Sequence, residues 1–397
     1  MAPPQTFVIE LDGGDKVFSP GDNLTGRVIA QTVDEKKLRG IYLTLKGQGY
    51  CHWSETYTTG SGDNQQTHTR YYTDVEPYFD FRVNLWGGSG DSQILPPGRY
   101  EFPFSLQLPN VPLPSVTEGF YGHIRYWLEA RMDRPWKFDH VTKRAFTILE
   151  RVDLNKAAED LTIPRRGENQ KTLCCLCCKS GPITVTVSTD RGGYCSGESI
   201  LVTAHVENLA NKNMRGLRAA LFRTITYYAQ GSRRLGSDKV AEMKTTQPIP
   251  AGQTFQWNQQ PLPIPPCPPS SHTCRIIHVD YHLSVVLQVP TGSFDMVLNI
   301  PLVIGTEPLA SVYADSGLPV SRFTAAPAVN IADNRYTMGQ TQFAPMYRTL
   351  TVAQPSAPPQ GGDGVRYESL PPPYPTEAAH PPVGQGQPPS NPLPYPA

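Results

Sequence analysis

The sequence of 397 residues lacks an excess of charge of either sign, because 35 basic residues balance 35 acidic ones. Binding to nucleic acid needs clustered positive charge that displaces counterions, so we expect no nucleic-acid partner. The sequence also lacks an apolar run of about 18 residues, the length of a membrane span. Its first residues lack the basic and apolar segments of a signal peptide. We therefore expect a soluble, intracellular protein.

Catalytic signatures are absent as well. The sequence contains no GxSxG, HExxH or P-loop motif, and no GxGxxG precedes an expected helix. Histidines that could act as bases are dispersed, and His123, His278 and His282 lie within strand-like patterns. We expect a protein that is not an enzyme, with no catalytic residues and no cofactor.

Cysteine is scarce outside one cluster. Four of the eight cysteines are Cys174, Cys175, Cys177 and Cys178. Their crowding does not give the spacing of a disulfide framework. A structural zinc site needs four tetrahedral ligands, and the other Cys/His group, at 267–278, has unsuitable spacing. We predict no metal site.

Proline, in contrast, is abundant and unevenly placed. Of the 41 prolines, 18 lie within residues 305–397, a stretch without lysine, tryptophan or cysteine. Such a composition buries too little apolar area to offset the entropy of ordering. We predict a disordered proline-rich tail over 309–397.

Before the tail, hydrophobic residues alternate with polar ones. Alternation occurs at 41–45, 102–108, 183–187, 200–206 and 279–289, with Gly, Pro and Asp turns between these runs. A period of two over such lengths predicts half-buried strands, and helical periodicity is scarce. The sequence therefore predicts an all-β fold.

An internal repeat divides the all-β part into two domains. Four short patterns recur in the same order in both halves: 18–24 with 194–200, 96–98 with 250–252, 106–109 with 262–265, and 124–128 with 279–283. Each copy has the size of an immunoglobulin-like β-sandwich. We predict one sandwich at 5–150, a linker at 151–179 and a second sandwich at 180–308.

The first repeated pattern has a physical explanation. Gly21 is followed by Asp22, and Gly197 by Glu198. Glycine allows the positive φ of a turn, and the acid after it can accept hydrogen bonds from neighbouring backbone N–H groups. We therefore predict the same turn in both domains.

These patterns resemble a known family. The first half, at 7–28, 95–109 and 118–136, resembles the arrestin N-terminal domain, and the second, at 180–208, 274–290 and 298–309, resembles the arrestin C-terminal domain. Asp133-Arg134-Pro135-Trp136 and Ile304-Gly305-Thr306 look like α-arrestins, the arrestin domain-containing proteins. The resemblance covers residues 5–308, about three quarters of the chain.

The resemblance implies two tandem arrestin-type sandwiches and a role as a cytosolic adaptor. Such adaptors connect membrane cargo, namely receptors or transporters, to HECT-type ubiquitin ligases, and so to endocytosis and sorting. It implies a cytoplasmic location with recruitment to the plasma membrane and endosomes, and peripheral membrane contact. An alternative is an arrestin-fold scaffold in ESCRT-linked vesicle budding or signalling, in which the ligase motif is incidental.

The tail carries a motif of the PPxY type at Pro371, Pro372 and Tyr374. A proline run presets the polyproline II helix, so little entropy is lost when it docks between the aromatic side chains of a WW domain. Family members usually carry two such motifs. Here the second, ending at Tyr395, has Leu393 in place of the second proline, which argues against the gain from bivalent binding.

A second tail motif precedes the first. Pro355, Ser356, Ala357 and Pro358 match the P[ST]AP pattern bound by the ESCRT-I sorting complex. An extended, exposed segment suffices for this recognition. The alternative is a chance match, because tails rich in Pro, Ser and Ala produce such patterns easily.

Lysines end before the tail. The last one is Lys244, so the tail has no side-chain amine that can accept ubiquitin. We expect a docked ligase to modify the cargo, or the linker lysines Lys156, Lys171 and Lys179.

The cysteine cluster has two surviving interpretations. We favour a partly packed interdomain segment, because a similar cysteine-rich stretch recurs in α-arrestins. S-palmitoylation of Cys174, Cys175, Cys177 and Cys178 is the second interpretation, since basic residues flank the cluster on a linker that can meet an anionic membrane.

Overall fold

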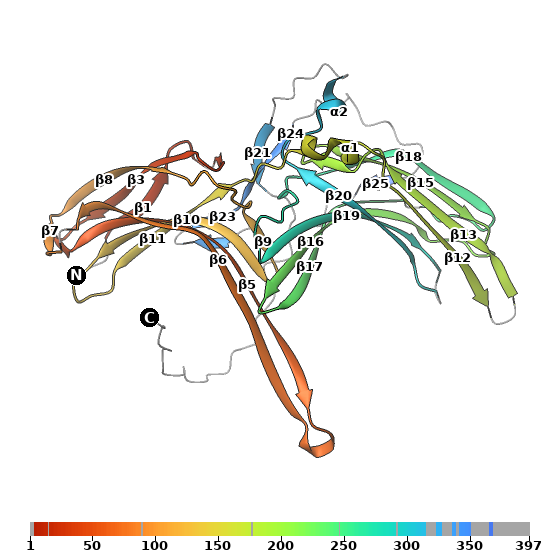
Figure 1. Ribbon diagram of the computed structural model, residues 1–397, viewed down its shortest axis with the longest axis horizontal. Helices are drawn as coiled ribbons and strands as arrows, with labels where there is room; N and C mark the ends of the chain where they lie inside the picture. The colour runs from red at the N-terminus through yellow and green to blue at the C-terminus, as the bar shows by residue number, and fades with distance from the viewer. Residues whose placement is uncertain are drawn as a thin grey trace.

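A computed structural model describes residues 4–14, 16–88, 90–175, 178–245, 247–290, 293–314, 323–327, 336–338, 341–350 and 365–367. Two β domains follow one another along the long axis of the molecule (Figure 1). In the described part of the chain, no helix has the length and apolar character needed to cross a membrane.

The N-terminal domain has two main sheets. The smaller has the strand order β1-β3-β8, and the larger has the order β2-β11-β10-β5-β6, with β9 paired to β10. Two short strands, β4 and β7, pair separately. The elements are β1 (Thr6–Leu11), β2 (Val17–Phe18), β3 (Asn23–Thr32), β4 (Lys36–Leu38), β5 (Gly40–Thr59), η1 (Gly62–Asn64), β6 (Gln66–Gly87), β7 (Gln93–Leu95), β8 (Gly98–Gln107), β9 (Thr117–Gly119), β10 (Gly122–Asp133) and β11 (His140–Ile148).

The C-terminal domain repeats this plan. One sheet has the order β12-β13-β15-β18, and the other has the order β14-β20-β19-β16-β17-β25. The elements are η2 (Leu154–Ala157), α1 (Ala158–Leu161), β12 (Arg166–Cys175), β13 (Cys178–Thr189), β14 (Gly193–Cys195), β15 (Ser199–Asn208), β16 (Gly216–Ala229), β17 (Ser232–Thr245), β18 (Gln253–Pro263), β19 (Ile277–Gln288), β20 (Met296–Gly305) and β25 (Val365–Tyr367).

The repeated turn is present in both domains. Gly21 has a φ of 85° and Gly197 a φ of 92°, in the region that favours glycine. The following acid accepts a hydrogen bond from the backbone N–H three residues before it, at 2.7 Å for Asp22 and 2.6 Å for Glu198. The strand just before each turn also pairs in the same way, because β2 runs parallel to β11 and β14 runs parallel to β20. The prediction that both domains contain the same turn is confirmed.

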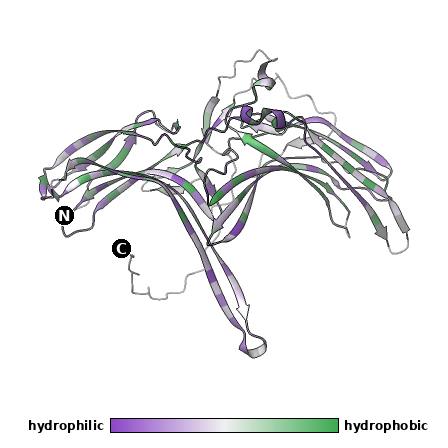
Figure 2. Cartoon of the chain, viewed as in Figure 1, coloured by the Kyte–Doolittle hydropathy of each residue, from purple (hydrophilic) through white to green (hydrophobic). Residues whose placement is uncertain are grey.

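The predicted alternation places one face of each strand in the core. Ile41, Leu43 and Leu45 on β5 are buried, and so are Ile183 and Val185 on β13. Figure 2 shows hydrophilic and hydrophobic residues alternating along the strands. The expectation of an all-β fold built from two sandwiches is confirmed.

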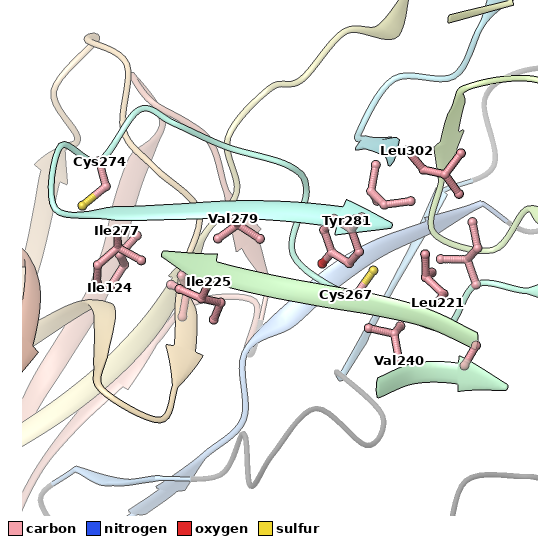
Figure 3. Close-up of a cluster of buried hydrophobic side chains, with 14 of the residues drawn as sticks. Ile124, Leu221, Ile225, Val240, Cys267, Cys274, Ile277, Val279, Tyr281 and Leu302 are labelled. Atoms are coloured by element: carbon pink, nitrogen blue, oxygen red, sulfur yellow. The ribbon is translucent and has the colours of Figure 1, made fainter. Parts of the chain in front are cut away.

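One buried cluster includes side chains from both domains. Ile124 on β10 of the N-terminal domain lies beside Ile225 and Ile277 of the C-terminal domain (Figure 3). Burial of apolar area stabilises such contacts by about 25 cal/mol per Å². The interface is therefore a continuation of the cores rather than a loose hinge.

The linker is shorter than expected. Residues 151–179 were expected to connect the domains, but β12 lies within this range and pairs with β13 in the second domain. Among the β12 side chains that the structure describes, at 166–173, Leu173 alone is buried, since β12 is an edge strand with one exposed side. The weak alternation of such a strand hides it from sequence patterns. The linker proper ends before Arg166 and contains η2 and α1.

The expectation of uniform disorder over 309–397 also needs correction. The tail contributes α2 (Ala310–Ala314), β21 (Phe323–Pro327), β22 (Tyr336–Met338), β23 (Thr341–Phe343) and β24 (Met346–Leu350). β21 pairs with β24, and Phe343, Tyr347 and Leu350 are buried. Composition missed these strands because few apolar residues are involved and they pack mainly on the body of the protein.

Candidate functional site

The two docking motifs predicted for the tail lie outside the described residues. Neither Pro355–Pro358 nor the PPxY residues Pro371, Pro372 and Tyr374 belong to the ranges that the structure describes. The nearest described element is β25, which pairs with the edge strand β17 and ends at Tyr367. The chain therefore lies beside the C-terminal domain shortly before the PPxY motif.

The cysteine cluster lies at a hairpin end. Cys174 is opposite Lys179, and Cys175 is opposite Cys178, where β12 and β13 meet. Cys177 and the side chains of the other three cysteines lie outside the described part. The β12–β13 end is at the outer end of the C-terminal domain (Figure 1). The favoured interpretation of an interdomain segment is therefore wrong, because the β pairing carries the cluster away from the junction.

The candidate ubiquitin acceptors have different surroundings. Lys156 is exposed in η2. Lys171 on β12 is half-buried, and its Nζ donates a hydrogen bond to the Phe294 carbonyl at 2.6 Å. Lys179 lies on β13, and its side chain is outside the described part. Of the two described amines, that of Lys156 is the more accessible.

A buried ion pair lies at the junction of the two domains. Arg223 on β16 is fully buried, and its Nη2 lies 2.6 Å from the Asp238 carboxylate on β17. The same nitrogen donates to the backbone carbonyl of Glu118 in the N-terminal domain at 3.0 Å. Within the described residues, Nε and Nη1 of Arg223 have no hydrogen-bond partner. The Asp238 carboxylate is therefore the main group that stabilises the buried charge of the Arg223 guanidinium.

A second carboxylate faces this junction. The Glu118 carboxylate receives two hydrogen bonds of 2.7 Å from Arg125. Burial raises the pKa of the Glu118 carboxyl, and the charge and hydrogen bonds of Arg125 act in the opposite direction. The junction thus combines the buried Arg223–Asp238 pair with the partly buried Arg125–Glu118 pair.

Strand β24 of the tail bridges the two domains at the same junction. Tyr347 is almost fully buried, and its hydroxyl donates to the Val116 carbonyl of the N-terminal domain at 2.9 Å. The Leu350 N–H donates to the Ser196 carbonyl of the C-terminal domain at 2.8 Å. A Cβ on Gly197 would lie 2.2 Å from the Leu350 carbonyl oxygen, so only glycine permits this approach.

The long β5–β6 hairpin projects from the body beside the junction (Figure 1). Near its base, Trp53 and Tyr72 are buried and stack with centroids 5.1 Å apart. Further out, Glu55 lies 3.5 Å from Arg234 of the C-terminal domain, and most of the described side chains beyond it are exposed. The hairpin therefore offers a long surface to a partner.

A charged concavity lies on the exposed face of the larger N-terminal sheet. It has a volume of about 420 Å³ and is lined by Arg39, Tyr42, Thr44, Lys46, Asp80, Arg82, Glu129, Arg131, Asp133 and Asp139. Arg39 pairs with Asp133 at 2.6 Å, and the Arg82 guanidinium stacks over the Tyr42 ring at 3.6 Å. A lining of paired charges suits a polar peptide rather than an apolar ligand.

Sequence patterns missed the buried ion pair although a signal was present. Leu221, Arg223, Ile225 and Tyr227 share one face of β16, and the other three are buried apolar or aromatic residues. An arginine on such a face requires a buried acid. The identity of that acid depends on the β16–β17 register, which pairs Arg223 with Asp238.

Known protein families match both domains. Residues 7–155 match the arrestin (or S-antigen) N-terminal domain, and residues 179–309 match the arrestin (or S-antigen) C-terminal domain. These ranges agree with the two sandwiches and with the family that the sequence patterns resemble.

Curated relatives extend the match into the tail. The chain is 32% identical over 371 residues to arrestin domain-containing protein 4 of Mus musculus, covering 90% of this chain and 82% of that protein. The Homo sapiens protein of that name is 32% identical over 364 residues, covering 90% and 81%. Thioredoxin-interacting protein of Mus musculus is 28% identical over 303 residues, covering 76% and 74%. The chain therefore belongs to the arrestin family, in its α-arrestin branch.

Proposed function

We propose that this α-arrestin adaptor links membrane cargo to WW-containing HECT-type ubiquitin ligases through Pro371, Pro372 and Tyr374. The observation that supports this most is the combination of an arrestin body with a PPxY motif only four residues after β25 ends at Tyr367. A ligase docked there is held close to the body and to whatever the body binds. Ubiquitination of the cargo then promotes its endocytosis and sorting.

Two surfaces of the body suit the cargo. The charged concavity, represented by Arg39, Arg82 and Asp133, suits a polar cytoplasmic segment of a receptor or transporter. The β5–β6 hairpin adds exposed edges and aromatic rings such as Tyr71. In this proposal, the protein resides in the cytoplasm and is recruited to the plasma membrane and endosomes when it binds cargo.

Ubiquitin acceptors follow from the lysine positions. Because the last lysine is Lys244, a ligase bound at Tyr374 must modify cargo or the body. Of the two candidates with described side chains, Lys156 and Lys171, Lys156 is the preferred acceptor, since it is exposed, whereas the amine of Lys171 is bonded to the Phe294 carbonyl.

Pulldown of HECT ligases from cells tests the ligase proposal. The wild type is compared with Tyr374→Ala and with a matched control, Tyr395→Ala, which alters the incomplete second motif. We expect Tyr374→Ala to lose the ligase and Tyr395→Ala to retain it. Equal recovery by Tyr374→Ala and the wild type would remove the PPxY motif from the mechanism.

A second candidate function is scaffolding of ESCRT-linked vesicle budding through Pro355, Ser356, Ala357 and Pro358. Its support is that the motif begins five residues after Leu350, the last residue of the strand that bridges the domains. Pro358→Ala should abolish ESCRT-I recovery and leave ligase recovery unchanged. Budding that persists in Tyr374→Ala but fails in Pro358→Ala would favour this function over the first.

Membrane attachment through the cysteine cluster belongs to the same proposal. Because the hairpin that contains Cys174, Cys175 and Cys178 lies at the outer end of the domain, acyl chains on the cluster can reach a membrane without disturbing the junction. Thioester-specific capture of the wild type, lost when all four cysteines including Cys177 are changed to serine, is the expected result. Equal capture of the wild type and the serine variant would show that the cysteine cluster is not the site of acylation.

A further inference from the structure

The three most exposed large apolar side chains in the described part of the chain lie on two turns. Trp136 and Phe138 are 101% and 96% exposed, and Phe294 is 89% exposed, whereas the next residues in this group reach only 62%. Fully exposed aromatic side chains are costly in water and commonly mark an interaction site. Their concentration on two turns therefore indicates an interaction site there.

The two turns occupy equivalent positions in the repeat. Trp136 and Phe138 lie between β10 and β11, and Phe294 lies between β19 and β20. Both strand pairs are adjacent in the larger sheet of their domain, and both turns lie at the outer ends of the molecule (Figure 1). The structure describes every residue of the N-terminal turn, at 133–140.

The N-terminal turn holds its aromatic side chains in place. The Asp139 carboxylate accepts from the Arg134 N–H at 2.9 Å and from the Arg131 guanidinium at 3.0 Å. Arg134 Nη1 donates to the Phe138 carbonyl at 3.3 Å. Trp136 has a φ of 60°, a conformation that costs a non-glycine residue about 1 kcal/mol or more. Because the turn is strained and cross-linked by hydrogen bonds, it holds Trp136 and Phe138 on the surface of the protein.

The charges around the turn that no ion pair neutralises are positive. Asp133 pairs with Arg39, and Asp139 is bonded to arginines. Lys137, between the two aromatic residues, forms no ion pair with any described residue. Tryptophan beside lysine and arginine is the combination found at the headgroup level of membranes, where the ring is amphipathic and cations meet anionic lipids.

We propose that the turn at 133–140 inserts Trp136 and Phe138 into the interface of an anionic lipid bilayer. A bilayer suits the turn better than a protein groove does, because the two rings project without a surrounding rim of partly buried apolar residues. This inference deepens the peripheral membrane contact of the proposed function and does not depend on the ligase motif. Insertion would orient the charged concavity, which Asp133 and Asp139 also line, toward cargo at the membrane.

Co-sedimentation of the full chain with phosphatidylcholine vesicles, with and without phosphatidylserine, tests the proposal. The variant W136S/F138S removes the two rings. The matched control I163S/L235S removes two exposed apolar side chains elsewhere, which are 53% and 56% exposed in the wild type. Quenching of tryptophan fluorescence by brominated lipids, compared between the wild type and W136F, reports whether residue 136 itself enters the lipid.

The wild type should bind vesicles with phosphatidylserine, and W136S/F138S should bind about tenfold less, since burial of two aromatic rings is lost. The control should change by less than about twofold, and binding of purified WW domains should be the same in all variants. Equal losses in both double variants, or no loss in W136S/F138S, would overturn the proposal. A change from dimer to monomer in W136S/F138S without any vesicle binding by the wild type would instead identify a contact between copies, and would also overturn it.

Discussion

The bridging strand β24 makes a strong prediction about how the tail is held. In Tyr347→Ala, the buried ring that lies between the domains is removed together with its hydrogen bond to the Val116 carbonyl. We expect the segment 341–350 to detach locally while both sandwiches remain folded, because the core contacts of the sandwiches do not include this ring.

The magnitude follows from the burial of Tyr347. Truncation of a fully buried aromatic side chain costs about 3–5 kcal/mol, of which the lost hydrogen bond accounts for about 1 kcal/mol. The other described contacts that hold β24 include its pairing with β21, the burial of Leu350, the Leu350 N–H bond to the Ser196 carbonyl, and a 3.1 Å bond from the Met346 N–H to the Thr147 hydroxyl. A cost of about 3 kcal/mol raises the constant for local opening roughly 150-fold.

Hydrogen exchange measured by mass spectrometry checks this expectation. Peptides covering 341–350 should exchange about 100-fold faster in Tyr347→Ala, whereas peptides from β10 and β19 should keep the wild-type rates. The control Tyr347→Phe keeps the ring and loses only the hydroxyl, so about a fivefold increase is expected. Unchanged exchange at 341–350 in Tyr347→Ala would refute the idea that this ring fastens the tail.

Two further predictions concern the junction and the larger N-terminal sheet. Asp238→Ala leaves the buried Arg223 guanidinium without its carboxylate. The free energy of unfolding, measured in urea, should therefore fall by about 3–5 kcal/mol. A loss below about 1 kcal/mol would contradict the stabilising role of the Arg223–Asp238 pair. Burial, helped by the charge of Arg125, lowers the pKa of the His123 imidazole to about 3. The unfolded chain therefore binds more protons below about pH 6.5, and stability should fall by about 1 kcal/mol between pH 7 and pH 5, allowing for partial exposure of the ring. His123→Gln should flatten this dependence in thermal unfolding, and an unchanged slope would assign it to other groups.

The parts of the fold that could be predicted depend on local patterns. Alternation at Ile41, Leu43 and Leu45 follows from one buried face of a strand, whatever its neighbours are. The turn at Gly21 and Gly197 is likewise local, because the glycine and the acid after it are close in sequence. The two sandwiches, and the repeat that relates them, could therefore be predicted from the sequence.

The parts that could not be predicted depend on contacts between distant segments. The short run around Tyr347 has no periodicity of its own, and its burial requires carbonyls of both domains. β12 is polar because it is an edge strand, so its sequence resembles a linker. Arg223 stands out on an apolar face, yet its partner Asp238 is defined by strand register alone. Trp136 belongs to a family motif and Phe138 belongs to none, and the exposure of both rings could not be predicted because exposure is a tertiary property.

The central claim is that Tyr374 recruits a HECT ligase to an arrestin body. Titration calorimetry of the purified full chain with the WW domains of such a ligase measures it directly. We expect binding by the wild type and by Tyr395→Ala, and at least about a 30-fold loss of affinity in Tyr374→Ala, as for a central hot-spot residue. Equal affinity of Tyr374→Ala and the wild type would show that Tyr374 does not recruit the ligase.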